Sequence, residues 1–500
     1  MDTIGIIDMG SNSVRLILVR VFKDLSFRLM DEHKESIRLG DGIDEFSNLK
    51  EDKIQDALKT MKMFKRLCDA QNATKIIAVA TAAVRKANNG QELIDRIYDE
   101  TNIDMKVISG KDEAYFDYLA VSHSVFSKDG LILDIGGGSF ELVLMKNREL
   151  IESVSIPMGS IDFAQKFKIK DPLTKDEEKK MIKFISDKLK EVPWLKSAKN
   201  LPLIGVGGTL RNIGKINMLK RNYPIDILHN YEVKTDEVFE IYDELKAMDY
   251  ESKKSYPGLS SDRADIFIGS LGLVSAIMKQ INSDKLIVSG KGVREGLFYN
   301  YLLEKNVYVD NPLMLSLENT TKIMGLDLVH SYQVRKLTKR LFDLLKPVHK
   351  ITDDVGNIID TSSLLHDAGI IINYYNHHRN SFFVILNSQV NGLSHKELLM
   401  SAYTASMHRK NKALENYSRY KLLLDSEDVQ KIKKIAIFLR IAESLDKSMS
   451  CIVSDLEIEI KKDKVIIKVI SKDNPEVELN DAKTAISAFK KLYKLDLIIE

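Results

Sequence analysis

The feature that most constrains the fold of this chain is an internal repeat with a constant offset of 126 positions. Residues 6–19, IIDMGSNSVRLILV, align without gaps on residues 132–145, ILDIGGGSFELVLM. Each copy has the pattern of an apolar strand, a DxGxxS turn and a second apolar strand. The repeat therefore predicts a duplicated α/β domain whose two turns face each other across a cleft. The alignment places Asp8 on Asp134, Gly10 on Gly136, Ser13 on Ser139 and Arg15 on Glu141.

The two turns have the composition of a phosphate site. Because glycine carries nothing beyond Cα, backbone N–H groups and neighbouring hydroxyls can point at one anion. An aspartate at the end of each first strand, Asp8 or Asp134, can hold a divalent cation that offsets the phosphate charge. Unrelated β-turns would explain one such motif but not two in register. We therefore predict that both turns contact phosphate through Gly10, Ser11, Asn12, Ser13, Gly136, Gly137, Gly138 and Ser139.

Composition narrows the class of protein. A chain of 500 residues, 44% hydrophobic and 29% charged, is typical of a globular protein with three or four domains. The N-terminus lacks the basic flank of a secretory signal, and no apolar stretch approaches membrane-spanning length. Cys68 and Cys451 are the only cysteines, so neither a disulfide framework nor a cysteine metal site is expected. A net charge of +2 argues against a dedicated nucleic-acid binder. From these features together we expect a cytosolic protein that binds neither nucleic acid nor membrane.

Further motifs identify a family. The segments that carry the signal are IGIIDMGSNSVRLILV, ATAAVRKANNG, VISGKDEAYFDYLAV, LILDIGGGSFELVL, GLSSDRADIF and VSGKGVREGLFY. They occur in the order and spacing of the exopolyphosphatase and guanosine pentaphosphate phosphatase (Ppx/GppA) family. The chain resembles this family over residues 3 to about 303. The resemblance implies an α/β N-terminal half with the duplicated actin-like fold of the acetate kinase, sugar kinase, Hsp70 and actin superfamily. It also implies a homodimer. We expect actin-like domains at 1–124 and 125–303, an all-α HD-like domain at 304–450 and a small α+β domain at 451–500.

The resemblance also implies roles for particular residues. Glu113, in ISGKDEA, matches the family's catalytic base, and Arg85, in TAAVRKA, matches an arginine of the phosphate path. The acids associated with Mg²⁺, for which Mn²⁺ could substitute, match Asp8, Asp134 and Glu141. Read from the residues alone, Arg15 can supply positive charge to the phosphate. Ser109 and Asp112 have capping-box spacing, which places Glu113 in the first turn of a helix ending near His123, where acids are also common because they complement the helix dipole.

A third glycine-rich stretch, LIGVGGTLRNIGKI at residues 203–216, predicts a buried strand, a turn at Gly205, Gly207 and Gly208, and a helix from Thr209. In actin-like folds such a turn lies against the nucleoside or closes the phosphate site. A GxGG turn between strand and helix is also common in α/β proteins without a ligand there. We include Gly207 and Gly208 among the predicted phosphate contacts.

Beyond residue 303 the sequence resembles the HD metal-dependent phosphohydrolase fold. Its ligand positions fall on His330, His366, Asp367 and Glu443, where Glu443 replaces the usual aspartate and its extra methylene shifts the carboxylate. His377, His378 and His408 could supplement this site or cap helices. The alternative is an HD-like domain that serves dimerisation and extends a substrate channel. Basic residues between Arg335 and Lys350 could then guide a long polyanion along that channel. The last fifty residues predict two strands, a helix and a strand.

Together these features favour an exopolyphosphatase that hydrolyses terminal phosphoanhydride bonds of inorganic polyphosphate. A pppGpp phosphohydrolase would use the same residues, and the helical extension with its basic stripe inclines the choice toward polyphosphate. An actin-like kinase is a more distant alternative, because it would need a base aimed at a substrate hydroxyl. A binding module without activity is the most distant.

Overall fold

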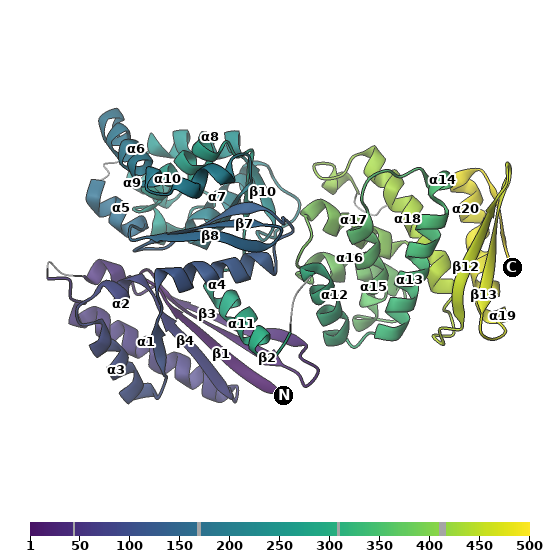
Figure 1. Ribbon diagram of the computed structural model, residues 1–500, viewed down its shortest axis with the longest axis horizontal. Helices are drawn as coiled ribbons and strands as arrows, with labels where there is room; N and C mark the ends of the chain where they lie inside the picture. The colour runs from purple at the N-terminus through teal and green to yellow at the C-terminus, as the bar shows by residue number, and fades with distance from the viewer. Residues whose placement is uncertain (44–45, 168–171, 308–310, 410–416) are drawn as a thin grey trace. The chain divides into compact units, whose positions relative to one another are not determined.

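The computed structural model describes residues 1–43, 46–167, 172–307, 311–409 and 417–500. These residues form two compact units, Met1–Asp310 and Asn311–Glu500, whose helices and strands are labelled in Figure 1. None of the helices in these ranges has the length and apolar character needed to cross a membrane. Each unit is described by itself below.

The first sheet of unit 1 has five strands in the order β3-β2-β1-β4-β5. Strand β1 pairs antiparallel with β2 and parallel with β4. Both faces of β1 are buried, since Ile7 and Met9 pack with helices α1 and α3 while Ile4 and Ile6 pack with α11. This two-sided burial explains why β1 is almost continuously apolar. The bounds are β1 Asp2–Met9, β2 Val14–Val21, β3 Phe27–Glu35, β4 Lys75–Ala80, β5 Met105–Val107, α1 Glu51–Ala70, α2 Ala82–Lys86, α3 Gly90–Thr101 and α11 Val293–Glu304.

The second sheet repeats this arrangement in six strands, in the order β10-β11-β9-β6-β7-β8. Strand β6 pairs antiparallel with β7 and parallel with β9, as β1 does with β2 and β4. The predicted duplication is therefore confirmed. The strands are β6 Gly130–Ile135, β7 Phe140–Lys146, β8 Glu149–Ile156, β9 Leu203–Val206, β10 Tyr231–Lys234 and β11 Lys285–Val288. The helices are α5 Ser160–Phe167, α6 Lys175–Lys190, α7 Gly207–Lys220, α8 Thr235–Lys246, α9 Tyr250–Lys254 and α10 Phe267–Ile281.

Helix α4, Gly110–Ser122, lies between the two sheets of unit 1 (Figure 1). Its Leu119 belongs to the core of the first sheet, whereas Ala114 and Val121 belong to the core of the second. The capping box predicted at Ser109 is present, and the helix ends with His123 as its C-cap. Because two faces of α4 are covered, the acids on those faces, Glu113 and Asp117, are held away from bulk water.

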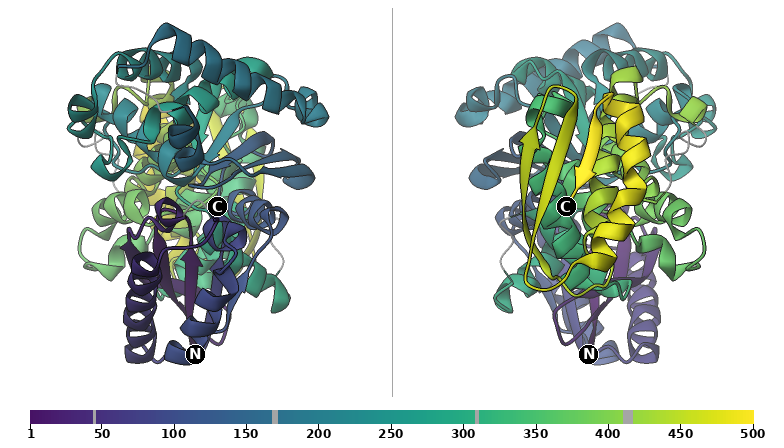
Figure 2. Two further views of the ribbon diagram at one scale, coloured as in Figure 1. Left: turned by 90° about the vertical axis from the view of Figure 1, so that its left-hand side faces the viewer. Right: turned by 90° about the vertical axis from the view of Figure 1, so that its right-hand side faces the viewer.

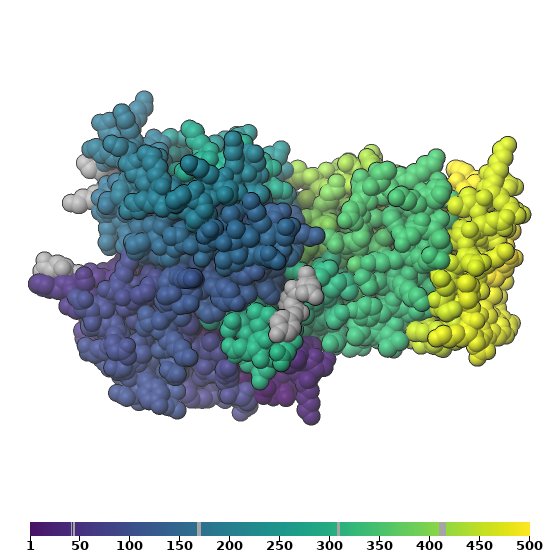
Figure 3. All heavy atoms as spheres, in the orientation of Figure 1, coloured from purple at the N-terminus to yellow at the C-terminus, as the bar shows by residue number. Residues whose placement is uncertain are grey.

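Helix α11 follows the whole second sheet in the chain but returns to the first. It packs on α4 and on β1, and its Leu297 and Phe298 share a core with Ile4 and Ile6. In the space-filling view its green residues lie in the same lobe as the purple strands of the first sheet (Figure 3). The start of α11 is thereby brought to the ends of both sheets.

Unit 2 is a group of helices with a three-stranded sheet at its C-terminal end, in the order β12-β13-β14. Apolar residues of α13, α18 and the three strands form one core, so the sheet is built onto the helices (Figure 2). The C-terminal segment contains a short helix, α19, in addition to the helix expected there. The bounds are α12 Pro312–Ile323, α13 Leu328–Leu344, α14 Lys346–His349, α15 Gly356–Leu364, α16 His377–Asn387, α17 His395–Ser406, α18 Ser426–Ser444, β12 Val453–Ile460, β13 Lys464–Ser471, α19 Glu476–Ala482, α20 Ile486–Tyr493 and β14 Asp496–Ile499.

Candidate active site

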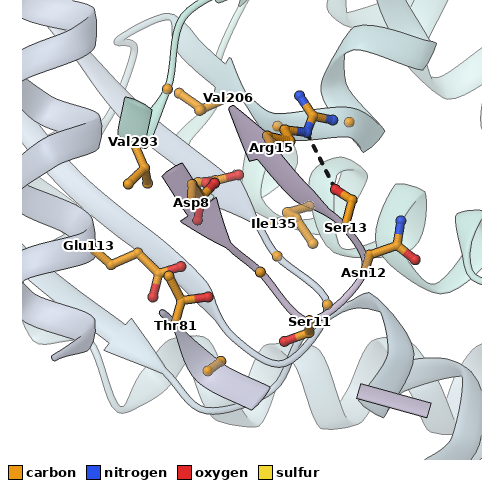
Figure 4. Close-up of a pocket in the computed structure, with 18 of the residues that line it drawn as sticks. Asp8, Ser11, Asn12, Ser13, Arg15, Thr81, Glu113, Ile135, Val206 and Val293 are labelled. Carbon is orange, nitrogen blue, oxygen red and sulfur yellow. Dashed lines mark hydrogen bonds between the residues drawn. The ribbon is translucent and has the colours of Figure 1, made fainter. Parts of the chain in front are cut away.

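A cavity of about 110 Å³ lies where the two repeats of unit 1 meet. It is lined by the β1–β2 turn, the β6–β7 turn, the β9–α7 junction and the first residues of α4 and α11. Figure 4 shows the Asp8 and Glu113 carboxylates entering it from β1 and α4. Most residues predicted for the site line it, namely Asp8, Gly10, Ser11, Asn12, Ser13, Arg15, Glu113, Asp134, Gly136, Gly137, Gly138, Ser139, Gly207 and Gly208. Their assigned roles remain predictions.

The two turns have the same backbone closure. The Gly10 N–H donates to Ser13 O at 3.0 Å, and the Gly136 N–H donates to Ser139 O at 2.9 Å. The turns also touch each other, since a Cβ on Gly137 would lie 2.7 Å from Ser11 Cβ. The second turn therefore needs glycine where the first has serine and asparagine, because side chains on both would collide. Close contact of this kind leaves the N–H groups of the two turns around one small volume.

The β9–α7 junction differs from the sequence prediction in its details. Gly205 lies within strand β9, and the helix begins at Gly207 and not at Thr209. Gly207 has a φ of +85°, which a residue with a side chain rarely adopts, and a Cβ there would press on Asp134 Oδ1. A Cβ on Gly208 would collide with the Arg263 guanidinium. The two glycines thus make room for the Asp134 carboxylate and the Arg263 guanidinium.

Three carboxylates converge beside the cavity. Ligand oxygens of Asp117, Asp134 and Glu141 all lie within 4.8 Å of one another. Asp117 is fully buried, and neither of its carboxylate oxygens has an N–H or hydroxyl partner among the described residues. Asp117 was not predicted from the sequence, although its spacing of four from Glu113 puts both acids on one face of α4. Asp8, which was expected in the metal set, belongs to no such close group in the described ranges.

Burial dominates the electrostatics of these acids. It raises the pKa of Asp8 to about 6, against the opposing charges of Arg294 and Arg15. Burial, reinforced by the Asp134 carboxylate, raises the pKa of Glu141 to about 8. Burial likewise raises the pKa of Glu113 and of Asp117 well above their usual values, with neighbouring carboxylates adding to the effect. Buried carboxylates that repel one another are stabilised by a cation, and oxygen-only donors suit Mg²⁺ or Mn²⁺.

Arginines are a second group of charged residues at the cavity. Arg15, Arg211, Arg263 and Arg294 all line it, and only Arg15 was predicted. Arg211 is supplied by α7, Arg263 by the turn before α10, and Arg294 by the start of α11. Arg263 and Arg294 lie in the segments GLSSDRADIF and VSGKGVREGLFY, so a motif signal for both was present in the sequence. A cavity lined by both acids and guanidinium groups fits a phosphate that also contacts a cation.

Arg85 and Glu141 were predicted for the site but do not line the cavity. The Arg85 guanidinium donates to Ile108 O at 2.7 Å and lies 3.4 Å from Glu113 Oε2. Arg85 therefore contacts the Glu113 carboxylate from outside the set of cavity-lining residues. Glu141 is buried, and Ser155 Oγ donates to its Oε1 at 2.8 Å. Arg85 therefore contacts the site through Glu113, and Glu141 belongs to the acid group beside the cavity.

The sequence pattern of the Ppx/GppA phosphatase family matches residues 18–305, which is more than half of the chain. The chain belongs to the Ppx/GppA phosphatase family. The pattern of domain III of the same family matches residues 314–491 in unit 2. The actin-like fold expected for the N-terminal half is shared with solved members of the family.

Family members of known structure cover unit 1. The chain is 28% identical to an exopolyphosphatase from Cytophaga hutchinsonii, with a TM-score of 0.58 over 61% of this chain and 98% of that one. It is 29% identical to the Aquifex aeolicus family member, with a TM-score of 0.54 over 61% and 99% of the two chains.

Curated relatives align with different fractions of the chain. It is 26% identical to a guanosine-5'-triphosphate,3'-diphosphate pyrophosphatase from Vibrio vulnificus, over 81% of this chain and 80% of that one. It is 30% identical to a bifunctional 3-dehydroquinate synthase/phosphatase from Fusobacterium nucleatum over 57% of this chain, which spans 44% of that protein.

In unit 2, His330, His366 and Asp367 lie close together, as expected, but Glu443 is not in this group among the described residues. The HD-like nature of this unit remains a prediction.

The basic residues of α13 are engaged within the unit, since Arg335 and Lys339 both pair with Asp360.

Proposed function

We propose that this family member is an exopolyphosphatase, which hydrolyses the terminal phosphoanhydride bond of inorganic polyphosphate and releases orthophosphate. The observation that carries the proposal is the placement of Glu113. It is a buried carboxylate held by Arg85 at the edge of a cavity that has two glycine-rich turns, an acid group and four arginines around it. Such a cavity suits a phosphoryl group, a cation and an attacking water together.

The chemistry follows from these positions. The terminal phosphoryl group contacts the backbone N–H groups of both turns and the cavity arginines, which orient it and balance its charge. Glu113 accepts a proton from water, whose oxygen forms a bond to the terminal phosphorus. The phosphorus–bridging oxygen bond breaks, and the shortened chain leaves with that oxygen. Asp117, Asp134 and Glu141 would hold Mg²⁺ or Mn²⁺, which supplies neutralising charge to the phosphate oxygens when bound.

The size of the cavity favours the end of a phosphate chain. At about 110 Å³ it is well below the roughly 300 to 1,000 Å³ of pockets that enclose a drug-sized molecule. It therefore suits a phosphoryl group better than a purine. The specific alternative is hydrolysis of pppGpp, which also ends in a phosphoanhydride. It is favoured by the Vibrio vulnificus relative, whose similarity covers 81% of this chain and so extends into unit 2.

The deciding experiment is steady-state orthophosphate release with Mg²⁺, comparing long-chain polyphosphate, pppGpp and ATP. A kcat/KM for polyphosphate about a hundredfold above that for pppGpp, or about 2.7 kcal/mol in transition-state binding, would establish the proposed substrate. The reverse preference would establish the pppGpp activity. Release from neither polyphosphate nor pppGpp would contradict both and favour the actin-like kinase. The expected homodimer can be checked on the same preparation by light scattering.

A further inference from the structure

A second group of chemically active side chains lies in unit 2, with no part in the reaction proposed above. His330, His366 and Asp367 form one close group, and Asp367, His377 and His408 form another, so Asp367 is common to both. His366, His377 and His408 are completely buried. They come from the ends of α15 and α17 and the start of α16, which pack against one another.

The hydrogen bonds of these histidines fix their tautomers. The Nδ1 atoms of His366, His377 and His408 lie 2.7, 2.8 and 2.7 Å from the carbonyl oxygen three residues earlier in the chain. A carbonyl oxygen can only accept, so each Nδ1 carries a hydrogen, and each Nε2 of a neutral ring is left with a lone pair. His330 is held in the same way, because its Nδ1 lies 2.7 Å from Asp446 Oδ2.

The lone pairs left by these bonds point at one another. His377 Nε2 lies 3.2 Å from His408 Nε2 and 3.0 Å from Asp367 Oδ1. His366 Nε2 lies 3.6 Å from Asp367 Oδ2 and has no hydrogen-bond partner in the part of the chain described. A proton added to one Nε2 atom would form a hydrogen bond across only one of these contacts. Buried Nε2 and carboxylate atoms therefore face one another, and each ring is fixed by a hydrogen bond from its Nδ1. Metal-binding histidines are typically arranged in this way.

We propose that unit 2 holds a transition-metal centre built around Asp367. Its Oδ2 faces His366, in the group that includes His330, and its Oδ1 faces His377 and His408, so a single carboxylate can bridge two ions. Imidazole nitrogens favour ions such as Mn²⁺, Fe²⁺, Co²⁺ or Zn²⁺ over Mg²⁺. The centre is therefore chemically distinct from the oxygen-only acid group of unit 1.

The proposed ligand set differs from the one suggested by sequence. It includes His377 and His408 and omits Glu443, whose Oε1 lies 3.5 Å from Lys447 Nζ and 3.7 Å from Arg409 Nη2. Each ion would have three protein ligands, which leaves coordination positions for exogenous ligands such as water or inorganic phosphate.

The test is the metal content of the full-length chain, purified without a histidine tag and exchanged into metal-free buffer containing Mg²⁺. One to two equivalents of transition metal per chain are expected, and Asp367→Asn and His408→Gln should each reduce this at least tenfold. His349→Gln is the matched control, because His349 is buried in the same unit with both ring nitrogens hydrogen-bonded, to Phe342 O and from Ile351 N. It should keep the metal.

A titration of metal-free protein with Co²⁺ provides a second readout that does not depend on what the protein acquired in the cell. Visible absorption bands should appear in the wild type and in His349→Gln, and inorganic phosphate should shift them. The same bands should appear in Asp117→Asn, whose change lies in unit 1. If the wild type gives neither bound metal nor Co²⁺ bands, or if Asp367→Asn binds as well as the wild type, the centre does not exist. Neither readout depends on phosphatase activity, so this test and that of the proposed function can fail separately.

Discussion

Asp134 lies directly opposite Glu141 in the β6–β7 pair, at the position where Asp8 lies opposite Arg15 in the β1–β2 pair. The duplication thus produces two equivalent positions with opposite chemistry. In the second repeat, two acids lie side by side and Asp117 joins them. In the first, burial raises the pKa of Asp8, and the charge of the Arg15 guanidinium across the strand pair opposes that rise. The asymmetry places an acid beside an acid in one repeat and an acid beside a guanidinium in the other, which fits the cation and the phosphate of the proposed function.

Replacing Glu113 by Gln removes the proposed base and keeps the size of the side chain. We expect kcat to fall by about 10²- to 10⁴-fold with little change in KM, because binding of the phosphate chain does not require the base. Orthophosphate release from polyphosphate measures this. Asp112→Asn is the control, since it removes a neighbouring, exposed acid of the same helix while keeping an acceptor for the capping box. Turnover by Glu113→Gln at the wild-type rate would disprove the assignment of the base.

Asp117→Asn tests the one member of the acid group that only the structure revealed. We expect the Mg²⁺ concentration for half-maximal activity to rise by about 10- to 100-fold. Without Mg²⁺ the variant should be at least as stable as the wild type, because a buried carboxylate with a raised pKa is costly when charged. Orthophosphate release titrated with Mg²⁺ measures the first effect, and the unfolding temperature without Mg²⁺ measures the second. Asp95→Asn, on the surface of α3, should behave like the wild type, and an unchanged Mg²⁺ requirement in Asp117→Asn would remove Asp117 from the metal set.

Gly207→Ala separates backbone strain from damage to the site. Gly207 and Gly325 both have positive φ, of 85° and 67°, so alanine at either costs about 1 to 2 kcal/mol in strain. Only at Gly207 does the added Cβ also press on Asp134, whereas Gly325 has open space around it. We expect Gly207→Ala to lose at least tenfold in activity and Gly325→Ala to keep its activity. Equal activity in both variants would show that the position of Asp134 is not sensitive to this contact.

His123 should make unit 1 less stable in acid. Burial lowers the pKa of His123 from 6.5 to about 4, so the unfolded chain binds this proton more readily than the folded one. The stabilisation is complete above about pH 6.5 and is lost as the pH falls toward about 4. His123→Phe preserves the stacking on Tyr299 and removes the titration. Between about pH 7.5 and about pH 5, the wild type should lose about 2 kcal/mol more of its free energy of unfolding than the variant.

Fluorescence of Trp194 reports this transition, because it is the only tryptophan of the chain and lies in unit 1. The comparison with His123→Phe is essential, since carboxylates with raised pKa values, such as Asp8, change stability in the opposite sense over the same range. Parallel losses in the two proteins would exclude His123 as the cause.

The local features of this protein could be predicted from its sequence. The offset between the two copies predicted the duplicated strand pairs, and the Ser109 capping box predicted the start of α4, because both depend on residues close together in the chain. The glycine-rich turns were placed correctly for the same reason. The first residue of α7 was not, since the helix begins at Gly207, two residues before the predicted Thr209.

Only the tertiary structure brought together groups that are distant in sequence. Arg211, Arg263 and Arg294 reach the cavity on three separate elements, and no local pattern reveals that three helices or turns end at one point. The same holds for His377 and His408, whose Nε2 atoms meet across two helices. The sequence by itself determined the repeated strand–turn–strand units and the family to which they belong. Packing decided which charges share a buried volume, because the burial and repulsion that define both candidate centres arise only when the helices and sheets have closed around them.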